Sequence, residues 1–188
     1  MIWMRRLHKW IGLVLGLQVA LWMLSGFMMG WLDHEKVQGM EFQAVSKPVA
    51  IGHPAQLIDL HSLLERRGLE GSVSSVNLVS ILDRSLYRVT SDRGVRLFDA
   101  TNGIPFEIDD GIAAAIATKD YAGPGGITTV SPVIAPMIEI RKHSGPAWRV
   151  DFDDSENTSI YVSARDGAIF ERRTDTWRLF DIFWMLHI

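Results

Sequence analysis

The chain has 188 residues, a formal net charge of −3 and no cysteine. Without cysteine it cannot form disulfides, thiolate metal sites or cysteine nucleophiles, and the composition is compatible with an oxidising compartment. A net negative charge, with no basic stripe beyond the N-terminal tail, argues against nucleic-acid binding. The length accommodates one domain with a real core in addition to a membrane anchor.

The first element in the chain is an uncharged stretch at residues 10–32. As a helix it would reach roughly 34 Å, enough to cross a hydrocarbon core of about 30 Å. Basic residues precede the stretch, whereas Asp33 and Glu35 follow it. Because basic residues stay on the cytoplasmic side, residues 1–9 are predicted to be a cytoplasmic tail and the chain from residue 33 onward extracytoplasmic.

Two other interpretations of this stretch are weaker. A cleaved signal peptide has an apolar core of about 7–15 residues followed by a small-x-small cleavage site. Here the apolar run is longer and ends in Met28, Met29, Gly30, Trp31 and Leu32. A buried helix of a soluble protein would seldom lack charge over this length. The sequence therefore favours a transmembrane helix.

Small residues recur on this helix at a spacing of four, in the pairs Gly12/Gly16 and Gly26/Gly30. Such a pair opens a flat surface on which another membrane helix can pack closely. Glycine is also common in membrane helices that pack on nothing in particular. The spacing predicts contact with another membrane helix or a protein partner, in addition to the lipid bilayer.

Residues 33–53 are predicted to be a polar juxtamembrane linker, with Pro48 and Pro54 interrupting regular structure. Leucines at three- and four-residue spacing over 57–64 predict a helix. Strand-like segments follow at 73–79, 86–90 and 95–100, and Asn102-Gly103 predicts a turn before 104–106. Residues 54–108 are thus predicted to form one helix followed by an antiparallel meander.

The same order returns over residues 109–175. We expect a short helix at 111–118, a strand at 137–140, and segments at 147–152 and 160–170 that echo strands of the first unit. Two copies of a helix-plus-meander unit predict an α+β fold.

The C-terminal residues 176–188 are aromatic-rich and mostly apolar. A run this short cannot cross a bilayer as a helix. Either it lies at the interface as an amphipathic segment, or it is the truncated start of a second membrane helix. The second interpretation is favoured.

Three groups of residues resemble one known family. They are Arg6-Leu7-His8-Lys9-Trp10-Ile11-Gly12 at the membrane helix, the "D-x-x-x-G"-like segments Phe98-Asp99-Ala100-Thr101-Asn102-Gly103 and Tyr161-Val162-Ser163-Ala164-Arg165-Asp166-Gly167, and Trp184-Met185-Leu186-His187. In this order they resemble the PepSY-associated transmembrane proteins over nearly the whole chain. The resemblance implies a bacterial inner-membrane protein whose periplasmic domain contains two PepSY-like units. The chain departs from the family at its end. In the family the second helix completes its crossing of the membrane, whereas here it does not.

Histidines are the candidate ligands for a metal or haem. A histidine as deep in a membrane segment as His187 is costly without a partner and marks a candidate functional site. Some larger relatives in the family are membrane haem proteins that reduce ferric siderophores. The resemblance therefore implies haem b held by His187 together with His34 or with a histidine of a neighbouring chain. It also implies a second site near the cytoplasm at His8, with its partner outside this chain. Alternatively, His8 is an interfacial residue, His34 is solvated, and His187 forms a hydrogen bond within a helix pair.

No catalytic motif or metal site is predicted. The acidic segment 151–156 lacks the glycine and distal glutamate of a calcium loop, and the glycines at 123–126 precede no Lys-Ser/Thr pair. Two function classes remain open. One is an accessory component of iron uptake or ferric-siderophore reduction. The other is a non-enzymatic periplasmic binding or regulatory module that captures a polypeptide by strand addition at an exposed sheet edge.

Overall fold

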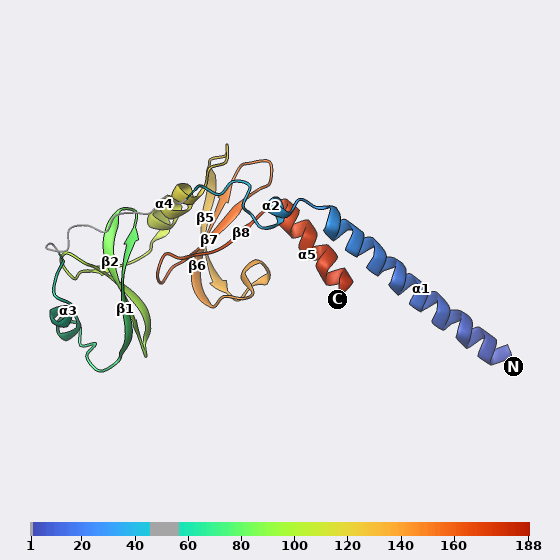
Figure 1. Ribbon diagram of the computed structural model, residues 1–188, viewed down its shortest axis with the longest axis horizontal. Helices are drawn as coiled ribbons and strands as arrows, with labels where there is room; N and C mark the ends of the chain where they lie inside the picture. The colour runs from blue at the N-terminus through green and yellow to red at the C-terminus, as the bar shows by residue number, and fades with distance from the viewer. Residues whose placement is uncertain (1, 46–56) are drawn as a thin grey trace. The chain divides into compact units, whose positions relative to one another are not determined.

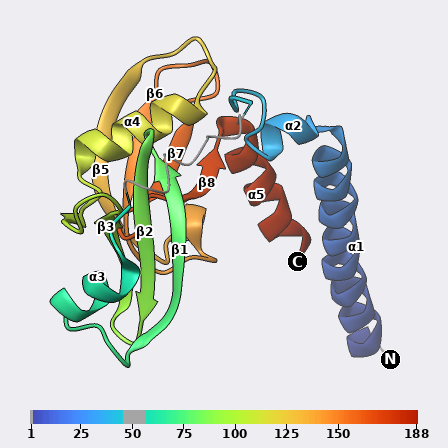
Figure 2. The same cartoon turned by 60° about the vertical axis from the view of Figure 1, so that its left-hand side comes forward.

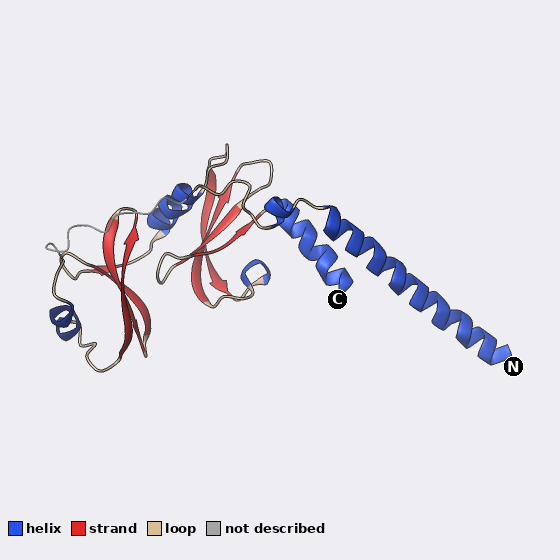
Figure 3. Cartoon of the chain, in the orientation of Figure 1, coloured by secondary structure: helices blue, strands red, loops and turns tan. Residues whose placement is uncertain are grey.

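The computed structural model describes residues 2–45 and 57–188 and divides into two units (Figure 1). The helical unit consists of Met1–Glu41 and Arg173–Ile188, and the sheet unit of Phe42–Arg172. Figure 3 shows long helices in the first and the strands in the second. The predicted linker falls partly outside the described residues, as do Pro48 and Pro54.

The helical unit contains α1 (Ile2–Trp31), α2 (His34–Val37) and α5 (Asp175–His187). Among the described residues, α1 alone is long and apolar enough to span a membrane, with a mean hydropathy of 1.9 over its most apolar window. Only 6% of that window is buried, so α1 is not a core helix of the described chain. It begins ahead of the predicted stretch and includes the basic residues of the tail.

Side-chain caps fix the ends of the two shorter helices. The Asp33 carboxylate accepts a hydrogen bond from the Glu35 backbone N–H at 2.9 Å and so begins α2. The Thr174 hydroxyl accepts from the Trp177 N–H at 3.0 Å at the start of α5, and donates to the Lys36 carbonyl at 2.8 Å. Thr174 thus joins α5 to α2.

The sheet unit is α+β and, within the described residues, contains two antiparallel four-stranded sheets (Figure 2). The first follows α3 (Leu60–Arg66) and has the order β1 (Val73–Ile81), β2 (Arg84–Ser91), β3 (Gly94–Asp99), β4 (Pro105–Phe106). The second follows α4 (Asp110–Asp120) and has the order β5 (Ile127–Ala135), β6 (Gly145–Phe152), β7 (Ser159–Ser163), β8 (Ile169–Arg173). A helix followed by a four-stranded sheet therefore occurs twice in the same order.

The prediction of a strand at 137–140 is wrong, because Met137 precedes a 3₁₀ turn, η2 (Ile138–Ile140). The first strand of the second sheet is β5, which the sequence analysis missed. Pro132 lies in the middle of β5, and a proline seldom occurs in a central strand of a sheet because it has no backbone N–H to donate. β5 tolerates this proline because, among the described strands, it pairs with β6 alone and so lies at the edge of the sheet.

One hydrophobic core joins both sheets. Its fully buried members include Leu86 of the first sheet, Ala113 of α4, and Val150 and Ile160 of the second sheet. A separate cluster of Leu63, Leu69, Val89 and Phe98 packs α3 against the first sheet. Because side chains alternate along a strand, Leu86 and Val89 lie on opposite faces of β2. The first sheet is therefore covered on both faces.

The turn after the third strand has the same hydrogen bonds in both sheets. The Gly103 N–H donates to the Asp99 carbonyl at 2.8 Å, and the Gly167 N–H donates to the Ser163 carbonyl at 3.0 Å. Both glycines have positive φ, +75° and +68°, a conformation that side chains disfavour. Burial acts to raise the pKa of Asp99, but hydrogen bonds from Thr101 and Asn102, together with the charge of Arg84, outweigh it and hold that pKa below its ordinary value.

Candidate binding groove at the open edge of β3

The fourth strand of the first sheet covers only part of its neighbour. β4 pairs with β3 at two positions, Leu97 with Phe106 and Phe98 with Pro105. In the part of the chain that the structure describes, pairing along this edge stops at Leu97. The first half of β3 therefore lies at an open edge.

The direction of the backbone groups on this edge follows from two hydrogen bonds. The Asp99 N–H points outward, toward the β4 side, and donates to the Ile104 carbonyl at 2.8 Å. The Ala100 N–H points inward, toward β2, and donates to the Ser85 carbonyl at 2.9 Å. Because backbone groups alternate in direction along an antiparallel strand, Val95 shares the outward direction of Asp99. Val95 thus presents its N–H and C=O at the open edge, where an additional strand can pair.

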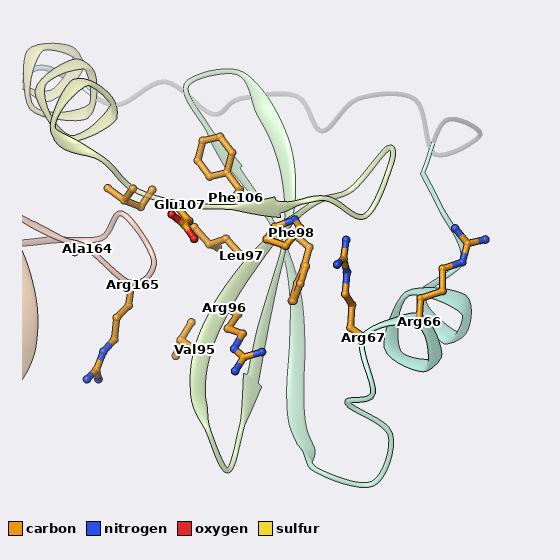
Figure 4. Close-up of a pocket in the computed structure, with 12 residues that line it drawn as sticks. Arg66, Arg67, Val95, Arg96, Leu97, Phe98, Phe106, Glu107, Ala164 and Arg165 are labelled. Atoms are coloured by element: carbon orange, nitrogen blue, oxygen red, sulfur yellow. The ribbon is translucent and has the colours of Figure 1, made fainter.

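A groove of about 710 Å³ runs along this edge (Figure 4). It is lined by Arg66, Arg67, Val95, Arg96, Leu97, Phe98, Pro105, Phe106, Glu107, Ile108, Ala164 and Arg165. The lining combines an apolar floor from β3 and β4 with four arginines and a single acidic residue. Its charge is therefore strongly positive.

The arginines approach from both sides of β3. Arg96 lies opposite Val89, which places it on the face covered by α3, near Arg66 and Arg67. Arg165 comes from the turn between β7 and β8 and lies on the other side of the strand in Figure 4. A strand docked between them would have positive charge on both of its faces.

Two of the four arginines are held by local contacts. A Cβ added to Gly145 would lie 2.8 Å from Cζ of Arg165, so that guanidinium packs on the backbone of β6. Arg67 donates from its guanidinium to the Gly103 carbonyl at 3.2 Å and 2.7 Å and lies over the Phe98 ring. Within residues 2–45 and 57–188, Arg66, Arg96 and Arg165 are exposed and form no ion pair. Exposed cations without partners can pair with a carboxylate at little desolvation cost.

In the helical unit, His187 contacts α1. Its Nδ1 lies 3.0 Å from the Ser25 hydroxyl, and Ser25 is only 2% exposed. The Ser25 hydroxyl also donates to the Trp22 carbonyl at 3.1 Å, and the direction of its hydrogen bond with Nδ1 depends on the tautomer of the imidazole. The hydrogen bond within a helix pair, one of the two interpretations of His187, is present.

The structure does not bring His34 and His187 together. His8, which was predicted to belong to a second site with its partner outside this chain, is about 26 Å from Ser25 along α1, at a rise of about 1.5 Å per residue. His34 is exposed in the first turn of α2, and among the described residues no contact joins it to His187. The described residues also contain no group of three or more histidine, aspartate or glutamate side chains suited to a metal ion.

Of the four predicted packing glycines, Gly26 lies against α5. A Cβ added to Gly26 would lie 3.2 Å from Cε1 of His187. Added to Gly12, Gly16 or Gly30, it would meet no described atom within 4 Å. Gly26 therefore lets α5 approach α1, whereas the other three glycines stay open to lipid or to another helix.

The sequence analysis did not predict the groove. Its arginines come from α3, from β3 and from the turn after β7, and nothing in the linear sequence brings these segments together. The sequence offered two signals for the groove. They are Arg96, within the strand-like segment 95–100, and the pair Arg66-Arg67 at the end of a helix.

Comparisons with family models, with curated proteins and with solved structures found no match to this chain. The assignment of a function therefore depends on the groove and the helix pair themselves.

Proposed function

We propose that the chain is a membrane-anchored, non-enzymatic binding module of the PepSY type, whose sheet unit captures an extended polypeptide at the open edge of β3. The observation that carries the proposal is the outward N–H and C=O of Val95 at an edge that β4 leaves uncovered. An extended segment can pair with such groups as an additional strand, while side-chain pockets along the edge provide selectivity.

The PepSY assignment is supported by the order of the elements. A helix and a four-stranded antiparallel sheet occur twice, and the segments that resemble the family's "D-x-x-x-G" ends form matching turns at Gly103 and Gly167. In this proposal α1 anchors the chain in a bacterial inner membrane, with its basic N-terminus in the cytoplasm and the sheet unit in the periplasm.

The capture of a polypeptide can be tested with a display library of short random peptides panned on the full chain in nanodiscs. The decisive variant is Val95→Pro, which removes the outward N–H while leaving the pairing of β3 with β2 intact. Ser80→Pro is the matched control, because by the same alternation Ser80 points outward at the opposite edge of the sheet.

We expect peptides selected on the wild-type chain to lose binding to Val95→Pro and to keep it to Ser80→Pro. If no peptide is enriched, or if the enriched peptides bind Val95→Pro as well as the wild-type chain, strand addition at β3 is wrong.

The proposed topology has its own test. A reporter enzyme that is active only after export, inserted after residue 60, should be active in cells. If a reporter that is active only in the cytoplasm is active at the same position, the orientation is the reverse of the one proposed.

A second candidate is the haem-dependent redox component implied by the family resemblance, with a role in iron uptake. One observation favours it: the Ser25 hydroxyl lies against Nδ1 of His187, so Nε2 is the ring nitrogen that would hold a haem iron, and metal-ligating histidines commonly have their other nitrogen hydrogen-bonded in this way. A reduced-minus-oxidised absorption spectrum of the purified chain tests this. Sharp b-type bands that His187→Ala abolishes would support it, and a featureless spectrum from haem-replete cells would reject it.

A further inference from the structure

We infer that the polypeptide segment captured at β3 is acidic, with carboxylates at neighbouring positions that point to both faces of the docked strand. This inference rests on the proposed strand addition and specifies its ligand. It follows from the way the four arginines of the groove are distributed around Val95.

Successive side chains of a docked strand point to opposite faces of the sheet. On the face covered by α3, they meet Arg96 and Arg67, whereas the Arg66 side chain at the end of α3 points away from β3 in Figure 4. On the other face they meet Arg165. A carboxylate on the α3 face would therefore face a guanidinium directly. A carboxylate at the next position would pair with Arg165 once that guanidinium turns from its contact with Gly145.

Charge complementarity selects an acidic segment over a neutral or basic one. Glu107 is the single carboxylate of the lining, against four guanidinium groups. Arg66, Arg96 and Arg165 lack an ion-pair partner among the described residues, so a ligand does not have to displace one. Guanidinium groups bind carboxylates through two parallel hydrogen bonds, which adds orientation to the attraction.

The same feature disfavours docking of a second copy of this edge. Two identical edges would bring arginine against arginine, and like charges opposite each other destabilise a strand pair. An acidic partner of different sequence relieves this repulsion.

The experiment measures binding of two synthetic peptides to the full chain in nanodiscs of neutral phosphatidylcholine. Both peptides consist of valine and threonine with blocked ends. One carries glutamate at its three central positions and the other carries glutamine at the same positions, so that shape is kept while charge is removed.

Two arginine variants are compared with each peptide. Arg96→Gln removes a charge from the groove. Arg93→Gln removes the same charge from the nearby β2–β3 turn, outside the groove, and is the matched control. Val95→Pro is measured in parallel to report on strand addition itself.

We expect the glutamate peptide to bind at least about tenfold more tightly than the glutamine peptide, and Arg96→Gln to weaken it by about three- to tenfold. Arg93→Gln should have no comparable effect. Raising the ionic strength from about 0.05 M to about 0.5 M should weaken the binding of the glutamate peptide and leave the binding of the glutamine peptide unchanged.

The outcomes separate this inference from the proposed function. Equal binding of both peptides, lost in Val95→Pro, would overturn the acidic ligand and leave strand addition intact. Binding of the glutamate peptide that is unaffected by Val95→Pro, or no binding of either peptide, would overturn both. Equal losses in Arg96→Gln and Arg93→Gln would indicate diffuse attraction and would also overturn the inference.

Discussion

The two sheets of this protein have the same element order but end differently. In the second sheet the fourth strand is β8, of five residues, whereas in the first it is β4, of two residues. The short β4 leaves half of β3 uncovered, and the groove with four arginines lies there. Under the proposed function, the second sheet serves as scaffold and the first supplies the binding edge, and charged side chains keep such an edge from pairing with itself.

The largest expected effect tests whether the two sheets are one folding unit. Leu86 is 0% exposed and belongs to the core shared by both sheets. Leu86→Ala should lower the free energy of unfolding by about 2–5 kcal/mol. Hydrogen exchange measured by mass spectrometry should accelerate in both sheets. Leu63→Ala, in the α3 cluster, is the control and should accelerate exchange mainly in the first sheet. If Leu86→Ala also affects the first sheet alone, the two sheets are not one folding unit.

A smaller effect is expected at a feature that the first sheet lacks. Tyr121, at the end of α4, donates to the Asp154 carboxylate at 2.7 Å, and Asp154 also accepts from the Glu156 N–H at 2.8 Å in the loop after β6. Tyr121→Phe should cost about 1.5–3 kcal/mol, as expected for a hydrogen bond to a charged group.

This cost should depend on pH. Burial and the hydrogen bond to Asp154 raise the pKa of Tyr121 to about 12 from an ordinary value of 10.0. A raised pKa means that the stabilisation is complete below about pH 10 and is lost as pH rises toward about 12. The difference in unfolding free energy between the wild-type chain and Tyr121→Phe should therefore shrink over this range, and a constant difference would contradict the assignment.

The two matching turns allow a direct comparison between the sheets. Gly103→Ala and Gly167→Ala each force a side chain into a positive-φ conformation and should each cost about 1 kcal/mol or more. A Cβ on Gly167 would lie 3.2 Å from Ile81 of the first sheet, whereas one on Gly103 would meet only Ile58 and Leu63. Hydrogen exchange should therefore respond in both sheets to Gly167→Ala and only in the first to Gly103→Ala. A response to Gly167→Ala confined to the second sheet would contradict the contact of this turn with the first sheet.

The smallest effect is expected at the ion pair between the sheets. Arg88 of β2 lies 3.7 Å from Asp166 in the turn after β7, and both side chains are partly exposed. Asp166→Asn should cost about 0–1 kcal/mol, because exposed pairs are screened by water and salt. A loss several times larger in a thermal melt would mean that this pair, rather than the shared core, holds the sheets together.

Much of the fold could be predicted from local patterns. The uncharged stretch predicted α1, and the alternating segments 73–79, 86–90 and 95–100 lie within the observed β1, within β2 and across β3. These features depend on residues close in sequence. β5 was missed because Pro132 interrupts its pattern, and only the sheet as a whole shows that β5 is an edge strand where proline is tolerated.

The groove and the helix pair depend on contacts between distant residues. Arg67 and Arg165 meet at β3 only after both sheets pack on a common core, and His187 meets Ser25 only after α5 lies along α1. Helical and strand periodicity show which face a residue occupies, but not which segment covers that face. For this reason the histidines were predicted as ligands, while the arginines were not singled out.

The most direct measurement for the open edge of β3 is the exchange rate of the Val95 amide, with and without the glutamate peptide bound, in the full chain in nanodiscs. Strand addition predicts that the Val95 amide becomes strongly protected on binding, while the Ser80 amide on the opposite edge keeps its rate. An unchanged rate at Val95 while the peptide is demonstrably bound would contradict docking at this edge.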